Sequence, residues 1–302
     1  WVVLAKHNSF YPFIAGGLFK LSLSEAMIKF ILQILPSILT VLLVYLICIE
    51  MYSDKRIALI ASFLTAIFWA HLFNSTRFHV DIPSLFTGLL AIYVFWKGYE
   101  KKEKIFKKIE PKWAMTIAVI LVVLTYTIRR GYFLFGAFFL IYLLSTKKFK
   151  ELIKDKYNWI ALATGIVLFF LSEKFIFSSK IKDIGEAYFH EELPITFKPI
   201  GVFDSFFSSY SSFPSILLYL FWIGLLIAVV NIFLSFGYIK KSEKSTAKPD
   251  LFNIITIILT LAFFMFIIRE PSAGEPRWYF PLALGSFIFI AKSTLLIADY
   301  TK

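Results

Sequence analysis

The sequence predicts an all-α polytopic membrane protein with about nine transmembrane helices. Of its 302 residues, 59% are hydrophobic and 17% are charged, and the mean hydropathy is +0.74, whereas a soluble domain is about 45–50% apolar and about 25% charged. Apolar segments long enough to cross a bilayer recur along the chain, and lysine-rich segments separate several of them. This hydrophobic composition excludes a soluble enzyme and a disordered protein. A disulfide scaffold is excluded because Cys48 is the single cysteine.

Nine apolar segments are the predicted spans. They cover residues 27–49, 57–73, 82–96, 113–128, 131–145, 158–172, 215–239, 251–268 and 278–298. The fourth and fifth are short and are joined by a tight turn at Arg129-Arg130, so they are either two spans or a half-embedded pair. We expect one transmembrane domain over residues 1–302.

Lysine counts predict how the helices are oriented. Residues 97–112 contain seven lysines, residues 147–156 contain five and residues 240–248 contain four. With the Asp54-Lys55-Arg56 turn, these segments fall on one side of a nine-span arrangement, which the positive-inside rule makes cytoplasmic. The net charge of +12 is therefore a signal of topology, aided by anionic membrane lipids, and no nucleic acid is expected as a partner.

The opposite side receives the remaining connections, and ionisable groups at their membrane edges are candidates for a site. Residues 1–26 are expected outside, with residues 11–23 as an interfacial helix. Residues 173–212 are too long for a simple connection and are expected to form an outer loop. Several outer segments with such groups indicate a single extracytoplasmic site.

The Arg77-Phe78-His79-Val80-Asp81-Ile82-Pro83 stretch is the most informative segment. Asp81 begins a predicted helix, and one interpretation is an N-cap aspartate. The alternative is a functional Asp81 that binds a divalent metal or orients a phosphate donor, with Arg77 and His79 beside it. The two interpretations are compatible.

Arginines on the predicted outer side suggest a phosphate site. Arg129 and Arg130 either extend from helix ends to the interface or bind phosphate, for which guanidinium geometry is suited. Arg277 and Tyr279 precede the last span and are either interfacial residues or a second contact to the same phosphate. A set of phenylalanines is expected to be ordinary helix packing, with a lipid-tail groove as the alternative: Phe133, Phe135, Phe138 and Phe139.

The order of the motifs resembles the GT-C superfamily of membrane glycosyltransferases, and most closely its protein O-mannosyltransferase and aminoarabinose-transferase branch. The segments that resemble it are, in order, H-x-x-x-Y-P from His7 to Pro12, S-E-x-x-x-K-F from Ser24 to Phe30, the R-x-H-x-D-x-P turn, the basic turn at Arg129-Arg130, and R-W-Y-F-P from Arg277. The similarity covers most of the chain but consists of short motifs whose order and sidedness carry the resemblance.

The resemblance implies a GT-C-like fold and transfer of a sugar, mannose among the candidates, from a polyprenyl phosphate to a protein, lipid or glycan. Asp81 matches the family's second acidic position, which is linked to a metal or to the donor phosphate. One basic position of the donor site is matched by Arg129 or Arg130, and a second by Arg277 together with Tyr279. A segment on the acceptor side is matched by His7 and Tyr11. Asn8 and Ser9 replace prolines of that segment, which leaves the role of His7 open.

The resemblance also implies a first span, a first outer loop and a catalytic base, all expected upstream of Trp1. A divalent cation (Mg²⁺, Mn²⁺ or Zn²⁺) is a candidate cofactor with Asp81 as a ligand. The expected location is the inner membrane of a prokaryote, with a role in the cell envelope. Two alternatives stay open: a flippase for a lipid-linked saccharide, and a polymerase or ligase of surface polysaccharide.

Overall fold

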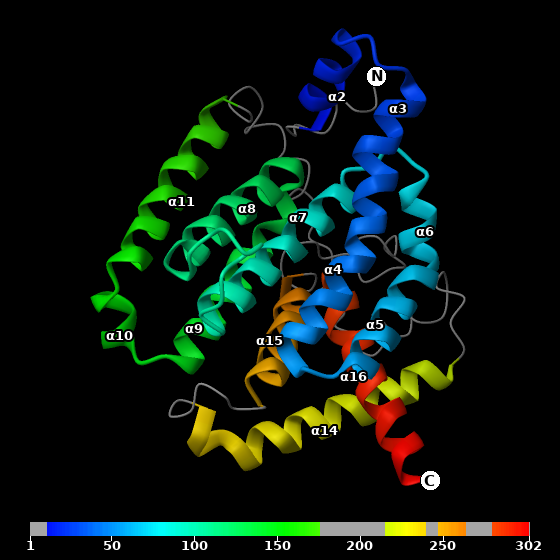
Figure 1. The fold of residues 1–302 in the computed structure, drawn as a ribbon, viewed down its shortest axis with the longest axis vertical. Coiled ribbons are helices and arrows are strands. Elements are labelled where there is room, and N and C mark those ends of the chain that lie inside the picture. The colour runs from blue at the N-terminus through cyan, green and yellow to red at the C-terminus, as the bar shows by residue number, and fades with distance from the viewer. Residues whose placement is uncertain (1–10, 176–214, 240–246, 264–279, 302) are drawn as a thin grey trace, which may run out of the picture.

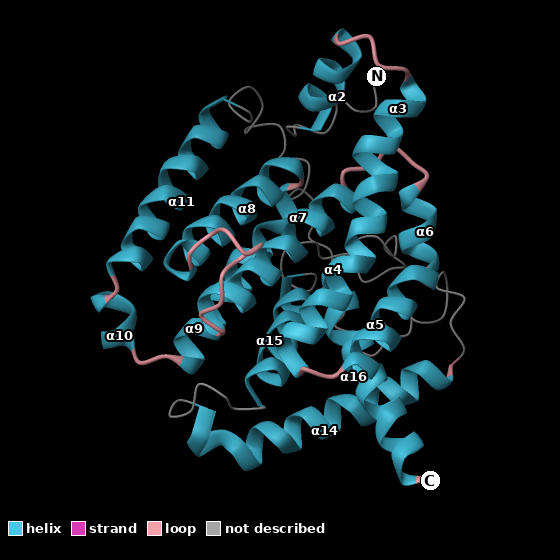
Figure 2. Ribbon diagram, viewed as in Figure 1, coloured by secondary structure: helices cyan, strands magenta, loops and turns pink. Residues whose placement is uncertain are grey.

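The computed structural model describes residues 11–175, 215–239, 247–263 and 280–301, and in these ranges the chain forms helices and no strand (Figures 1 and 2). The α-helices are α2 (Tyr11–Lys20), α3 (Glu25–Lys29), α4 (Leu35–Tyr52), α5 (Lys55–Ile67), α6 (Trp69–Ser75), α7 (Asp81–Val94), α8 (Ala114–Ile128), α9 (Leu134–Thr146), α10 (Phe149–Lys154), α11 (Lys156–Phe175), α14 (Ile216–Ile239), α15 (Ala247–Phe263) and α16 (Phe280–Tyr300). Two π-helical segments, η1 (Phe30–Ile34) and η2 (Phe95–Glu100), and two short 3₁₀ helices, η3 (Pro111–Trp113) and η4 (Arg130–Phe133), adjoin them. The all-α prediction is confirmed.

Within the described residues, each of the nine predicted spans falls mainly on helix, but the number of nine spans is not confirmed. Among the described residues, five helices are long and apolar enough to cross a membrane, and a sixth results if the bent pair α5–α6 is one span. The helix α9, even together with η4, covers only Arg130–Thr146. This helix falls short of the about 20 residues that span a hydrocarbon core.

The helices α14 and α16 pack closely across each other. Figure 1 shows α14 running across the lower part of the view, below α15 and beside α16, whereas α4 and α11 run steeply upward. A Cβ atom added at Gly224 of α14 would come within 2.0 Å of the backbone oxygen of Phe289 in α16. Glycine at this position therefore permits the two backbones to touch.

A break at Phe68 separates α5 from α6, and the two helices meet at a bend of 56°. Phe68 adopts an extended conformation (φ −63°, ψ 114°), and its buried ring packs edge-on against Phe280 and Phe287 of α16. The bend directs α6 toward α4, where Nε2 of the buried His71 lies 3.3 Å from Oγ of Ser37.

The core between α7, α9 and α15 is aromatic. Phe95 packs against Phe139 in a tilted contact with ring centroids 4.7 Å apart, and both rings also contact Phe252. Phe135, Phe138 and Phe139 are buried with exposed fractions of 5% or less. Their expected role as helix packing is therefore confirmed, while Phe133 is 44% exposed.

Ion pairs gather the lysine-rich segments at one end of the bundle. The carboxylate of Glu50 accepts from Nζ of Lys97 at 2.5 Å and of Lys101 at 2.9 Å. Glu100 lies 3.5 Å from Lys147 and 3.6 Å from Lys248. Segments that are distant in sequence thus meet at what we call the lysine end.

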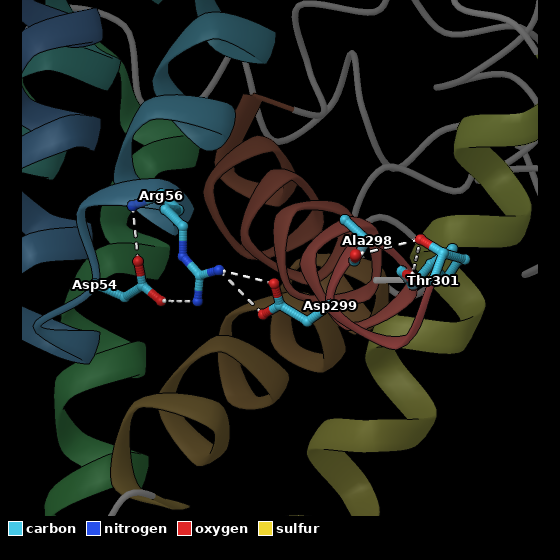
Figure 3. A network of polar contacts seen from close by, with 6 residues as sticks. Asp54, Arg56, Ala298, Asp299 and Thr301 are labelled. Carbon is cyan, nitrogen blue, oxygen red and sulfur yellow. Dashed lines mark hydrogen bonds and ion pairs between the residues drawn. The ribbon is translucent and has the colours of Figure 1, made fainter.

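Two further sets of contacts at the lysine end join α16 to α4, through α15, and to α5. The buried Asp250 accepts from the hydroxyl of Tyr52 at 2.8 Å and from Nζ of Lys292 at 2.6 Å. Figure 3 shows Arg56 between Asp54 and Asp299: its guanidinium lies 3.3 Å from the first carboxylate and 3.0 Å from the second. These contacts fix α16 against α4 and α5.

Candidate functional site

The opposite end of the bundle holds a pair of successive arginines. Helix α8 ends at Ile128, and Arg129 has extended backbone (φ −145°, ψ 113°) before η4 begins. Successive side chains of extended backbone point to opposite sides. Arg129 accordingly faces α7, and Arg130 faces α11.

Asp81 forms an ion pair with Arg129. Asp81 is the first residue of α7 and is 1% exposed, whereas the side chain of Arg129 is 22% exposed. Val80, not Asp81, holds the N-cap position of α7, so the N-cap interpretation of Asp81 is wrong. An acidic group in the first turn still interacts favourably with the helix dipole.

Arg130 and Glu173 form a second ion pair, with 3.6 Å between Nη2 and Oε2. The hydroxyl of Tyr126 in α8 donates a hydrogen bond to Oε1 of the same carboxylate. Glu173 lies inside α11, so the outer loop predicted from residue 173 begins later than expected, because the helix continues to Phe175. The rest of that loop lies outside the described residues.

The turn that precedes Asp81 is held by a buried glutamine. Gln33 in η1 is 0% exposed. Its Nε2 donates a hydrogen bond to the carbonyl oxygen of His79, at a distance of 2.6 Å, and another to the hydroxyl of Tyr11. Rings of Tyr11 and Phe78 lie 6.2 Å apart. Gln33 therefore ties α2 and α4 to the turn, and π-helical segments such as η1 are frequent at functional sites.

An apolar groove of about 330 Å³ runs between α8 and α11, which lie side by side in Figure 1, and reaches η4. Its lining includes Val119, Val122, Tyr126, Phe133, Gly165 and Phe169. A Cβ atom at Gly165 would lie 2.7 Å from Cγ1 of Val119, so this glycine lets the two helices approach. Tyr126, whose hydroxyl is bonded to Glu173, is one of the lining residues.

The structure brings together some of the predicted site residues. Asp81, Arg129, Arg130 and Tyr11 lie in the contacts above, and the backbone of His79 joins them through Gln33. The exposed Arg77 places its guanidinium carbon 3.6 Å from the ring centroid of Phe73, and its backbone oxygen accepts from the N–H of His79. Three predicted residues lie outside the described part of the chain: His7, Arg277 and Tyr279.

Sequence inspection missed Gln33 and Glu173 as site residues. Gln33 was detectable as an amide within an apolar run of residues 30–49, because a polar group in a span requires a partner. Glu173 was detectable as a carboxylate directly after the apolar residues of α11. Neither signal names the partner, which only the packing of helices supplies.

A metal ligand set is not formed by the described residues. In the ranges that the structure covers, no group of three or more His, Cys, Asp or Glu side chains is close enough to hold an ion. Asp81 faces a guanidinium there, and a hard cation prefers several oxygen ligands. We therefore assign no step of the reaction to a metal.

The fold is similar to that of solved archaeal oligosaccharyltransferases. A crystal structure of the Archaeoglobus fulgidus oligosaccharyltransferase tethered to an acceptor peptide matches with a TM-score of 0.54 and 17% identity, over 95% of this chain and 40% of that one. The archaeal oligosaccharyltransferase AglB of the same organism, in complex with an inhibitory peptide and a dolichol-phosphate, matches with a TM-score of 0.53 and 17% identity, over 95% and 41%. The chain thus spans about two fifths of these proteins.

Residues 6–172, more than half of the chain, match the family described as dolichyl-phosphate-mannose-protein mannosyltransferase. The chain belongs to this family, and the predicted resemblance to GT-C enzymes is confirmed. A comparison with curated proteins finds no match. The chain is therefore a multi-pass membrane protein of this family.

Proposed function

We propose that the protein transfers a sugar, mannose in the first instance, from a polyprenyl phosphate to a peptide acceptor. The observation that supports this most is the placement of Arg130 beside an apolar groove, because Arg130 pairs with Glu173 and Tyr126 both bonds to Glu173 and lines the groove. A polyprenyl phosphate has two parts that complement these features, an anionic head for an arginine and an apolar tail for the groove. The description of the family and the dolichol-phosphate and peptide of the archaeal structures support the same choice.

In the proposed reaction, an acceptor oxygen or nitrogen bonds to C1 of the sugar while the bond from C1 to the phosphate oxygen breaks. The donor is a phosphodiester with one negative charge. The departing phosphomonoester gains a further charge, and the acceptor proton leaves to a base or solvent. Arg129 and Arg130 therefore stabilise the leaving group more than the donor, which is the requirement for catalysis rather than tight binding alone.

Asp81, the groove and Tyr11 have different proposed roles in the site. Asp81 is buried and keeps Arg129 directed into the site through their ion pair. The groove between α8 and α11 is proposed to hold the first isoprene units of the donor, with Phe133 and Tyr126 near the phosphate. Tyr11 lies at the same end and is proposed on the acceptor side with His7.

The end of the bundle that holds Arg129 and Arg130, which we call the arginine end, is proposed to face the extracytoplasmic side of a prokaryotic inner membrane. Lysines gather at the opposite end through the contacts of Glu50 and Glu100. Short loops that are rich in lysine stay in the cytoplasm. The proposed acceptor is then a peptide or glycan of the cell envelope.

Transfer of labelled mannose from polyprenyl-phosphate mannose to a peptide by the full-length protein tests the proposal. Charge-assisted hydrogen bonds are worth about 1.5–3 kcal/mol, so Arg129→Ala or Arg130→Ala is expected to lower kcat/KM by roughly 10- to 150-fold. Arg→Lys is expected to lose much of this, because lysine cannot bind phosphate with two parallel hydrogen bonds. Arg56→Lys at the lysine end is the matched control.

Two results contradict the proposal. Transfer that is unchanged in both alanine variants would show that the arginines only anchor helix ends. Movement of the lipid-linked sugar across vesicles without transfer would instead identify a flippase.

A further inference from the structure

Glu173 and Asp81 each neutralise one arginine of the site, but their surroundings differ. Asp81 is 1% exposed and begins a helix in the core of the bundle. Glu173 is 24% exposed, lies in the last turn of α11 and is 3.6 Å from Arg130. Charge-assisted N–H···O contacts are about 2.7–2.9 Å long when well formed. The pair of Arg130 and Glu173 is thus the looser and more solvated of the two.

The charges of these groups limit how a phosphate binds. Arg129 and Arg130 contribute two positive charges, and Asp81 and Glu173 contribute two negative charges, so the four side chains are neutral together. A phosphodiester that enters with both carboxylates in place meets like charges as well as guanidiniums. Exchange of one carboxylate for the phosphate removes this repulsion. Separating the buried Asp81 from Arg129 leaves a desolvated charge without compensation, which costs more than freeing a partly exposed pair.

We infer that Glu173 is a displaceable carboxylate that occupies Arg130 in the absence of donor and gives way to the donor phosphate. This inference rests on the proposed donor. Glu173 then acts as a positioning residue that sets affinity: it holds Arg130 in place before binding, and it competes with the phosphate for the same guanidinium. Tyr126 assists, because its hydroxyl bonds to Glu173 and its ring lines the groove.

The same competition applies to the product. Polyprenyl phosphate binds the arginines more strongly than the donor because it has the greater charge, and its release is a separate step. The return of Glu173 to Arg130 restores the ion pair as the product leaves. Loss of the carboxylate is therefore expected to strengthen product inhibition as well as donor binding.

The test is the dissociation constant of undecaprenyl phosphate for the full-length protein in detergent, for the wild type and for Glu173→Gln. A partly exposed ion pair affects an equilibrium by up to about fivefold, and removal of like-charge repulsion adds to this, so we expect binding about threefold to tenfold tighter. The KM for the donor is expected to fall in parallel, without a matching rise in kcat. Glu25→Gln, an exposed residue at the start of α3, makes the same charge change away from the site and is expected to leave binding unchanged.

Unchanged or weaker binding in a Glu173→Gln protein with normal melting overturns the inference, because a purely structural carboxylate gives one of these results. Tyr126→Phe removes one bond to Glu173 and is expected to tighten binding in the same direction by a smaller factor. It decides the question if Glu173→Gln does not fold. A wild-type protein that binds no undecaprenyl phosphate contradicts the proposed donor itself, which is a different result from normal wild-type binding with no gain in the variant.

Discussion

Asp81 and Arg129 form an ion pair that joins the first residue of α7 to the residue that follows α8. The carboxylate is buried, and the guanidinium carbon also lies 5.4 Å from the ring centroid of Tyr132. The pair thus fixes the relative position of two helices and of the side chain that we propose to bind phosphate. Its two roles, in stability and in chemistry, are separable by mutation.

Asp81→Asn and Arg129→Gln each leave one charge of the pair without its partner. Loss of one member of a buried pair costs about 3–5 kcal/mol, so both single variants are expected to melt at clearly lower temperature. The double variant removes both charges and is expected to recover much of the stability but none of the transfer activity. A double variant that is active would show that neither charge takes part in the chemistry.

Gln33 is expected to control the turn that precedes Asp81. In Gln33→Leu, the carbonyl oxygen of His79 loses its donor, and an unsatisfied buried acceptor costs about 1–3 kcal/mol. We expect kcat to fall and the melting temperature to decrease, with donor affinity less affected. Thr40→Val is the control, because Thr40 lies in α4, which directly follows η1, and its hydroxyl bonds within α4, to the carbonyl of Pro36. An equal loss of kcat in both variants would mean that general packing, not the turn, is responsible.

The groove is tested by a pair of neighbouring residues on α11. Ile166 lines the groove and is 48% exposed, whereas Val167 is 56% exposed and is not among the lining residues. Ile166→Trp is expected to fill the groove and to raise KM for long polyprenyl donors, with little effect on a donor that has a short tail. Val167→Trp is expected to leave both KM values unchanged. Equal effects on long and short donors would place the tail elsewhere.

Asp54 is expected to make the stability of the lysine end depend on pH. Partial burial raises the pKa of its carboxyl, but hydrogen bonds from the backbone N–H and guanidinium of Arg56 outweigh this and lower the pKa below the ordinary value of 3.8. A carboxyl whose pKa is lower in the folded state stabilises that state above pH 3.8, and the contribution is lost as the pH falls through the folded pKa.

Asp54→Asn is the variant for this effect, because asparagine keeps the N-cap of α5 and removes the charge. The wild type is expected to melt slightly above the variant at pH 7, and the difference is expected to shrink as the pH falls through the lowered pKa of Asp54. Melting curves recorded in parallel at several pH values measure it. A difference that stays constant with pH would assign the effect to the cap alone.

Topology is tested by cysteines in a Cys48→Ala background, since Cys48 is buried. Thr76→Cys lies at the arginine end, and Lys104→Cys lies in the lysine-rich loop. An impermeant thiol reagent applied to intact cells is expected to label the first variant, and to label the second only after lysis. The reverse pattern would place the site in the cytoplasm.

The sequence by itself determined that the chain lies in a membrane, where its helices are and at which end of the bundle the lysines gather. These follow from local properties, namely the length of apolar runs and the spacing of charges. It also named Asp81, Arg129 and Arg130, because ionisable groups at span ends need partners. The family resemblance rested on the same short segments.

Only the tertiary structure decided which partners these groups have. The pairing of Asp81 with Arg129 and of Arg130 with Glu173 depends on how α7, α8 and α11 pack, and packing joins residues that no local pattern relates. The placement of Gln33 against His79 and the groove beside Gly165 arise in the same way. The number of spans also depended on structure, because the break at Phe68 divides one apolar run into two helices that meet at a bend of 56°.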